Sequence, residues 1–178
     1  MMSDAATPDD AGVAALGVRE LLDLTVARLV ESGARDEALG TLNPGKGLLG
    51  LRTNAKMVPN GRAWRLGVLL LDRDGNLFAT GSLTRAVVPG RVTNQNLAQE
   101  ARKADRLAAA RGKFDAGEVV NYRYTPIEVT AESLRGGAGV LLLVDGVTMV
   151  RWDRVGGTQA LTALDAYLDE RFDLLFAD

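Results

Sequence analysis

One apolar phrase occurs twice in the sequence, and each copy runs into a turn signal. Residues 67–78 read GVLLLDRDGNLF and residues 139–150 read GVLLLVDGVTMV. A run of bulky apolar residues that ends in Asp and Gly is typical of a strand that folds back, because Gly readily adopts the positive φ that tight turns need. We interpret both phrases as hairpins and not as reactive loops. Two hairpins predict an antiparallel sheet.

Three segments have the apolar spacing of helices that would cover this sheet. We expect helices from about Ala11 to Ser32, over 94–111 and from Thr158 to Phe176. The first has an apolar stripe made of Val18, Leu21, Leu22, Val26 and Leu29. The second has a small apolar face, and its other face carries Arg102, Lys103, Arg106 and Arg111.

The remaining segments complete the predicted fold. We expect a helical turn at Arg35 to Leu39, a loop over 41–61 and a single strand over 118–129, where Val120, Tyr122 and Tyr124 alternate with polar residues. The predicted fold class is α+β, in the order α-ββ-α-β-ββ-α, with an antiparallel sheet of about five strands covered by three helices. Residues 1–10 are predicted to form a flexible tail, and 11–178 a single α+β domain.

Missing residue types exclude much common chemistry. The 178 residues include no Cys and no His, so there is no thiol nucleophile, no imidazole base and no Cys or His metal ligand. The acidic, polar start MMSDAATPDD is not a secretory signal, and we expect a cytoplasmic protein without a membrane span. Arg outnumbers Lys by 17 to 4, which indicates a GC-rich, bacterial coding sequence.

Motif tests argue against three nucleotide or ion sites. The first phrase resembles the opening strand of a Nudix hydrolase, but the next expected helix offers only Glu100 and Asp105 and lacks the paired glutamates of that family. A calcium loop starting at Asp72 would need Glu at its twelfth position, where Leu83 stands. The glycine-rich loop around Lys46 lacks the spacing and the Ser or Thr of a P-loop.

Positive charge gathers in the middle third of the chain. Residues 41–99 carry eight basic and two acidic side chains, although the whole chain has a net charge of −2. We predict that the segment 46–65 binds a small anionic ligand, because guanidinium groups beside an aromatic ring bind phosphate or carboxylate. The candidate residues are Lys46, Arg52, Lys56, Arg62, Trp64 and Arg65. The alternative is that Arg65 is a solvated strand residue, that Trp64 packs in the core or an interface, and that the arginines pair with the acidic first helix.

The predicted function is non-catalytic binding or assembly, with no cofactor and no metal site. One alternative is an enzyme that uses carboxylates or tyrosines with a bound metal, for which Asp72, Asp74, Glu100 and Glu118 would have to converge. The other is a structural homo-oligomer. Leu174 and Phe176 lie outside the main stripe of the last helix, which favours a homodimer. The net charge argues against a dedicated nucleic-acid-binding protein.

Overall fold

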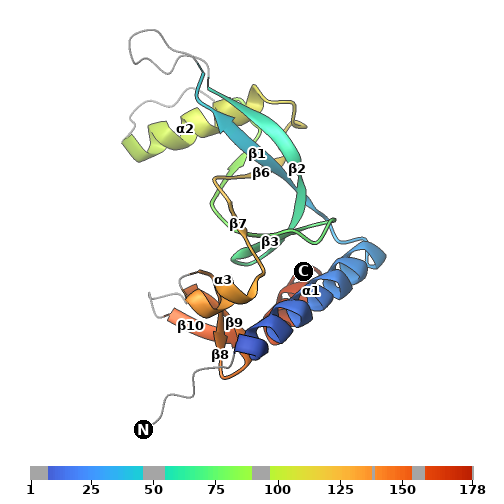
Figure 1. Cartoon of the computed structure of the whole chain (residues 1–178). Coiled ribbons are helices and arrows are strands. Elements are labelled where there is room, and N and C mark those ends of the chain that lie inside the picture. Colours follow the sequence, from blue (N-terminus) through green and yellow to red (C-terminus); the bar gives the residue numbers. More distant parts are fainter. Residues whose placement is uncertain (1–7, 46–54, 90–96, 138, 154–158, 178) are drawn as a thin grey trace. The chain divides into compact units, whose positions relative to one another are not determined.

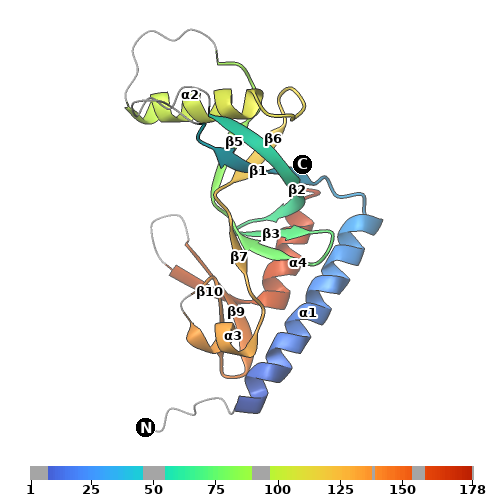
Figure 2. The same ribbon diagram turned by 45° about the horizontal axis from the view of Figure 1, so that its top comes forward.

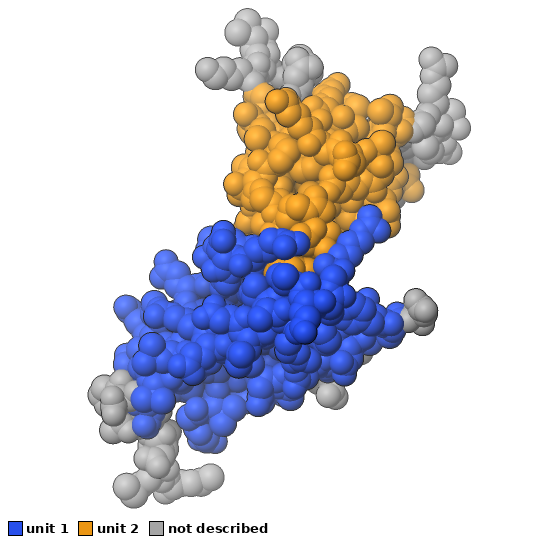
Figure 3. All heavy atoms as spheres, turned by 90° about the vertical axis from the view of Figure 1, so that its right-hand side faces the viewer, with its two compact units in different colours: residues 1–35, 65–79, 126–178 blue, residues 36–64, 80–125 orange. Residues whose placement is uncertain are grey.

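The computed structural model describes residues 8–45, 55–89, 97–137, 139–153 and 159–177. This part of the chain is a mixed α+β structure with four helices, a seven-stranded mixed sheet and a three-stranded antiparallel sheet (Figure 1). The chain divides into two compact units, coloured separately in Figure 3. Unit 1 contains residues 1–35, 65–79 and 126–178, and unit 2 contains residues 36–64 and 80–125.

Unit 2 is built from strands and a single described helix. Its elements are β1 (Glu37–Asn43), β2 (Lys56–Leu66, which continues into unit 1), β5 (Ser82–Arg85), α2 (Leu97–Ala110) and β6 (Val119–Tyr122). Strand β1 pairs antiparallel with β2 and parallel with β6, and β5 pairs antiparallel with β6. Figure 2 shows α2 lying across β5, β6 and β1. Its buried Ala108 and Ala109 pack with Met57, Val120 and Tyr122, so small helix residues allow close contact with the sheet.

Unit 1 begins with a long helix whose apolar stripe enters the core. Helix α1 (Pro8–Glu31) buries Val18, Leu22 and Leu29, which are exposed by 4%, 2% and 0%. The hairpin of β3 (Leu69–Asp72) and β4 (Leu77–Ala79) belongs to the same unit. The three leucines of β3 are fully buried, as the apolar phrase predicts. Strand β7 (Thr125–Ile127) follows β4 in the strand order β5-β6-β1-β2-β3-β4-β7 of the larger sheet.

The C-terminal part of unit 1 contains the smaller sheet and two helices. Its elements are α3 (Ala131–Gly136), β8 (Leu141–Val144), β9 (Val147–Asp153), β10 (Gln159–Ala163) and α4 (Leu164–Leu174). Helix α4 buries Leu164, Tyr167 and Leu168. The hydroxyl of Tyr167 accepts a hydrogen bond from the Val68 amide at 2.9 Å and donates one to the Leu66 carbonyl at 3.2 Å. One buried side chain thus holds the turn before β3 against α4.

Both hairpins predicted from the repeated phrase are confirmed. Strands β3 and β4 pair antiparallel around the turn at residues 72–76, and β8 and β9 pair antiparallel around Asp145-Gly146. The first helix is also confirmed, although it starts at Pro8, inside the segment predicted to be a tail. The second helix is confirmed over Leu97–Ala110, and residues 94–96 of the predicted range lie outside the described residues.

The sheet and helix counts predicted from the sequence are wrong in several places. The segment 41–61 is not all loop, since its described ends belong to β1 and β2, and residues 37–39 are strand and not a helical turn. The strand expected over 118–129 is interrupted at Arg123, whose φ of 56° breaks the extended backbone. The final helix starts only at Leu164, because residues 159–163 pair with β9 as strand β10. Short helix α3 was not predicted.

None of the helices in the described ranges combines the length and the apolar character needed to cross a membrane.

Candidate functional site

Arg62 of β2 is held by two carboxylates of unit 2. Its Nε donates to Asp36 Oδ1 at 2.7 Å, its Nη1 donates to Glu118 Oε1 at 2.5 Å, and its Nη2 donates to the Asp36 carbonyl at 3.0 Å. The side chains of Asp36 and Glu118 are only 15% and 14% exposed. All three guanidinium nitrogens therefore have hydrogen-bond partners within the unit. Through these bonds Arg62 connects β2 to segments that are far away in sequence.

The pKa values of this cluster agree with that geometry. Burial raises the pKa of Glu118, but the hydrogen bonds from Arg62 and from the Asp115 amide outweigh it, so the net pKa lies below the ordinary 4.5. The pKa of Arg62 lies above its ordinary value, mainly because of its hydrogen bonds to Glu118 and Asp36. Both shifts stabilise the charged forms, so Arg62 and Glu118 are ionised at neutral pH.

Two more acidic residues of unit 2 are engaged in internal hydrogen bonds. The amide of buried Asn121 donates to Glu37 Oε2 at 2.7 Å, and the hydroxyl of Tyr122 donates to Asp105 Oδ2 at 2.7 Å. Burial and the bond to Asp105 raise the pKa of Tyr122 above its ordinary 10.0. Of the six acidic residues of unit 2, four are thus used inside the unit, while the remaining two, Glu100 and Asp115, are exposed.

The six residues predicted to bind an anion are placed in different environments. Trp64 is fully buried, so its ring faces other parts of the protein and not a ligand. Arg62 is held as described above, and Arg65 is half-buried, has a partner, and belongs to unit 1. Lys56 at the start of β2 is exposed. Lys46 and Arg52 lie outside the described residues.

The cations that unit 2 presents at its surface lie mainly on and beside α2. Arg102 and Arg106 are exposed and stand one turn apart on the helix, and neither is held in an ion pair within the described ranges. Gly112 lies against the backbone of Met57, which brings the segment after α2 next to the start of β2. Other cations of unit 2 that are exposed or half-buried are Lys56, Arg85, Lys103, Arg111, Lys113 and Arg123.

The two units carry net charges of opposite sign. Unit 2 carries twelve Lys and Arg against six Asp and Glu, a net charge of +6, whereas unit 1 carries nine against seventeen, a net charge of −8. The basic face of α2 is visible in the sequence. The sequence does not show which acidic residues form hydrogen bonds inside the unit, because their partners lie far away along the chain.

The residues of the alternative catalytic site do not form a described cluster. Asp72 and Asp74 belong to unit 1 and Glu100 and Glu118 to unit 2. Within the described ranges, no group of three or more Asp and Glu side chains is arranged to hold a metal ion. Tyr122 is in the core and Tyr124 accepts a hydrogen bond from Asn60 at 2.6 Å.

Comparisons with known proteins found no matching family model, no matching curated protein and no matching solved structure.

Proposed function

We propose that the protein is a non-catalytic binding protein whose unit 2 binds a small anion with several phosphate groups. The observation that supports this most is the net charge of unit 2, which is +6. Four of its six acidic residues also accept hydrogen bonds from side chains of the same unit. A surface of this kind attracts anions, and Arg102 and Arg106 can bind phosphate oxygens through two N–H groups each.

The binding surface that we propose differs from the segment 46–65 predicted from the sequence. It is centred on the basic face of α2, made of Arg102, Lys103 and Arg106, and it includes Lys56 and Lys113. A phosphorylated small molecule fits better than a nucleic acid, because the described aromatic side chains of unit 2 are buried or half-buried and offer no exposed ring for base stacking.

The test compares binding of a short polyphosphate, a nucleoside triphosphate and single-stranded RNA by isothermal titration calorimetry in low salt. The variant Arg102→Gln/Arg106→Gln should bind the polyphosphate about tenfold more weakly, since each lost phosphate contact removes a charge-assisted hydrogen bond. Arg102→Lys/Arg106→Lys keeps the charge and should lose less. The control is Arg35→Gln, which changes an exposed arginine of unit 1.

Clear outcomes would refute this function. If neither the polyphosphate nor the triphosphate binds to the wild-type protein in low salt, unit 2 does not serve as an anion site. If RNA binds and the two smaller anions do not, the ligand class is wrong. Equal binding by the wild type and the Arg102→Gln/Arg106→Gln variant would place the site elsewhere.

A structural homo-oligomer is the second candidate, and specific exposed residues favour it. Leu174 and Phe176 at the end of α4 are 51% and 49% exposed, and Val144, Val147 and Leu161 share one face of the smaller sheet and are 36%, 49% and 48% exposed. Apolar side chains gathered in this way are typical of protein contacts. Light scattering of the wild type and of Val147→Lys/Leu161→Lys tests this candidate, and a monomeric wild type would exclude it.

A further inference from the structure

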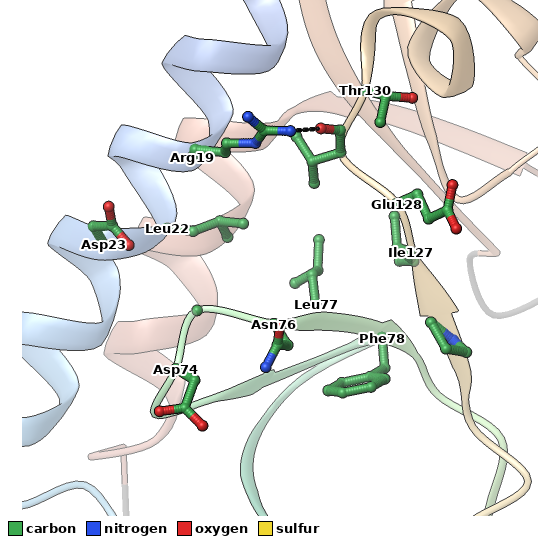
Figure 4. Close-up of a pocket in the computed structure, with 13 residues that line it drawn as sticks. Arg19, Leu22, Asp23, Asp74, Asn76, Leu77, Phe78, Ile127, Glu128 and Thr130 are labelled. Carbon is green, nitrogen blue, oxygen red and sulfur yellow. Dashed lines mark hydrogen bonds between the residues drawn. The ribbon is translucent and has the colours of Figure 1, made fainter.

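A hollow of about 740 Å³ lies within unit 1. Three segments form its walls: α1 on one side, the β3–β4 turn with the start of β4 below, and the segment from β7 to the start of α3 on the other side (Figure 4). This volume lies in the range of sites that hold small organic molecules, about 300–1,000 Å³. The hollow shares no residue with the basic surface of unit 2, so the argument below does not depend on the proposed function.

The inner surface of the hollow is apolar. Leu22 of α1 and Leu77 of β4 are 2% and 3% exposed and form its deepest part, and Phe78 and Ile127 are half-buried beside them. Figure 4 shows Leu22, Leu77 and Ile127 pointing toward the same space. A ligand with a hydrocarbon or aromatic body would remove the exposed parts of Phe78 and Ile127 from water, and burial of apolar surface is the main source of affinity in such sites.

The rim of the hollow is negatively charged. Three exposed carboxylates stand on it, Asp23 from α1, Asp74 from the turn and Glu128 after β7, and each comes from a different wall. The rim has a single cation, Arg19, and its Nη2 donates to the Val129 carbonyl at 2.8 Å (Figure 4). Arg19 therefore joins two walls, and the residues around the hollow carry three carboxylates against this one cation.

The walls are held in place by their own hydrogen bonds. Asp72 Oδ1 accepts from the amides of Asp74 and Asn76 at 2.9 and 2.8 Å, and Asp72 Oδ2 accepts from the Asn76 side chain at 2.9 Å. Gly75 has a φ of +79°, and a Cβ there would lie 3.3 Å from Asp23 Oδ1. The turn thus approaches α1 closely. This wall is therefore ordered before a ligand enters, which lowers the entropic cost of binding.

We infer that this hollow binds an organic cation, a protonated amine carried on an apolar body. The apolar part would lie against Leu22, Leu77 and Ile127, and the ammonium group would donate hydrogen bonds to the carboxylates of Asp23, Asp74 or Glu128. Charge complementarity selects this class, because a carboxylate-bearing ligand of the same shape would meet three like charges.

The test uses three probes with one body and different charges: 4-phenylbutylamine, 4-phenylbutanol and 4-phenylbutanoate. Binding is followed by NMR shifts of the methyl and ring signals of Leu22, Leu77, Phe78 and Ile127. The amine should bind about tenfold tighter than the alcohol, which corresponds to a modest ion-pair contribution, and the butanoate should bind most weakly.

Matched variants separate the rim carboxylates from the general charge of unit 1. Asp23→Asn/Glu128→Gln should reduce the affinity for the amine about tenfold and leave that for the alcohol unchanged. The control, Glu20→Gln/Glu132→Gln, removes the same charge from exposed positions outside the hollow and should bind the amine like the wild type. Equal affinity for the three probes, no effect of the rim variant, or shifts confined to other residues would overturn the inference.

Discussion

The two units differ most in how they use their acidic residues. In unit 2, Asp36, Glu37, Asp105 and Glu118 all accept hydrogen bonds from side chains of the same unit, and the cations remain at the surface. In unit 1 the excess is acidic, and many of its carboxylates are exposed, as at the rim of the hollow. The comparison teaches that the charge of a surface depends on which charged side chains form hydrogen bonds inside the protein and which remain exposed. A net charge of −2 for the whole chain conceals two regions of opposite sign.

The two tryptophans allow this comparison to be tested, because Trp64 belongs to unit 2 and Trp152 to unit 1. Fluorescence of the Trp152→Phe protein reports on unit 2, and fluorescence of the Trp64→Phe protein reports on unit 1. We predict one urea transition with the same midpoint in both proteins, in line with the single domain predicted for residues 11–178. Two separated midpoints would show that the units unfold independently.

The largest effect is expected at Gly81 of unit 2. A Cβ at this position would lie 2.1 Å from the Arg123 carbonyl oxygen and 2.6 Å from that of Tyr122, and backbone atoms cannot move away as a flexible side chain would. Gly81→Ala should therefore destabilise the protein by about 3 kcal/mol or more, measured by urea denaturation. A loss below about 1 kcal/mol would mean that β5 and β6 do not approach as closely as described.

Removal of the Arg62 side chain and its two ion pairs should have the next largest effect on stability. Arg62→Ala leaves the largely buried carboxylates of Asp36 and Glu118 without their cation, and we expect a loss of about 2 kcal/mol at pH 7. This loss bears on the site as well, since an Arg62→Ala/Arg65→Ala protein would lose affinity for an anion partly through destabilisation. Circular dichroism during urea denaturation provides the measurement.

The same variant has a predicted pH dependence. The pKa of Glu118 is below 4.5 in the folded protein, so its ion pair stabilises the fold above that pH, and the contribution is lost as the pH falls through the lowered pKa. The difference in stability between the wild type and Arg62→Ala should therefore shrink below about pH 4.5. A difference that stays constant down to pH 3 would contradict this prediction.

Unit 1 offers a matching test with an uncharged network. Tyr167→Phe leaves the Val68 amide and the Leu66 carbonyl without their partner in a buried place, and we expect a loss of about 1–2 kcal/mol. Because no charge is removed, this loss should not change between pH 7 and pH 4. A stability loss that changes between pH 7 and pH 4 would contradict this prediction.

The smallest effect has the opposite sign. Gly17 lies exposed in the middle of α1, and a Cβ there would meet nothing within 4 Å. Gly17→Ala should stabilise the protein by about 0.5–1 kcal/mol, because Ala loses less backbone entropy in a helix than Gly. Thermal denaturation checks this value. A destabilised variant would indicate that this exposed face of α1 contacts something else.

Local patterns predicted the elements that depend on neighbouring residues. The apolar stripe of α1 and the turns at Gly75 and Gly146 are encoded within a few positions, and they are confirmed. Strands β1 and β10 were missed because their sequences, EALGTLN and QALTA, do not alternate, and their pairing is with residues in other strands. In such strands tertiary pairing decides the conformation and propensity does not.

The candidate site was predictable to a smaller extent. The sequence identifies the basic residues of α2 and of the segment 46–65, but the partners of Arg62 lie 26 and 56 residues away. The sequence raised a buried Trp64 and paired arginines only as an alternative to ligand binding, and the fold shows that Trp64 is buried and that Arg62 pairs with Asp36 and Glu118 and not with the first helix. The hollow in unit 1 was missed altogether, because its walls come from three separate parts of the chain.

The path of the chain between the units has a consequence for biosynthesis. The backbone passes from one unit to the other after residues 35, 64, 79 and 125. On a ribosome, every segment of unit 2 has been made once residue 125 is released, whereas unit 1 still awaits the strands β8 to β10 and helix α4. Helix α1 must therefore wait for partners that are made later, and until then its apolar stripe is exposed to water and to chaperones.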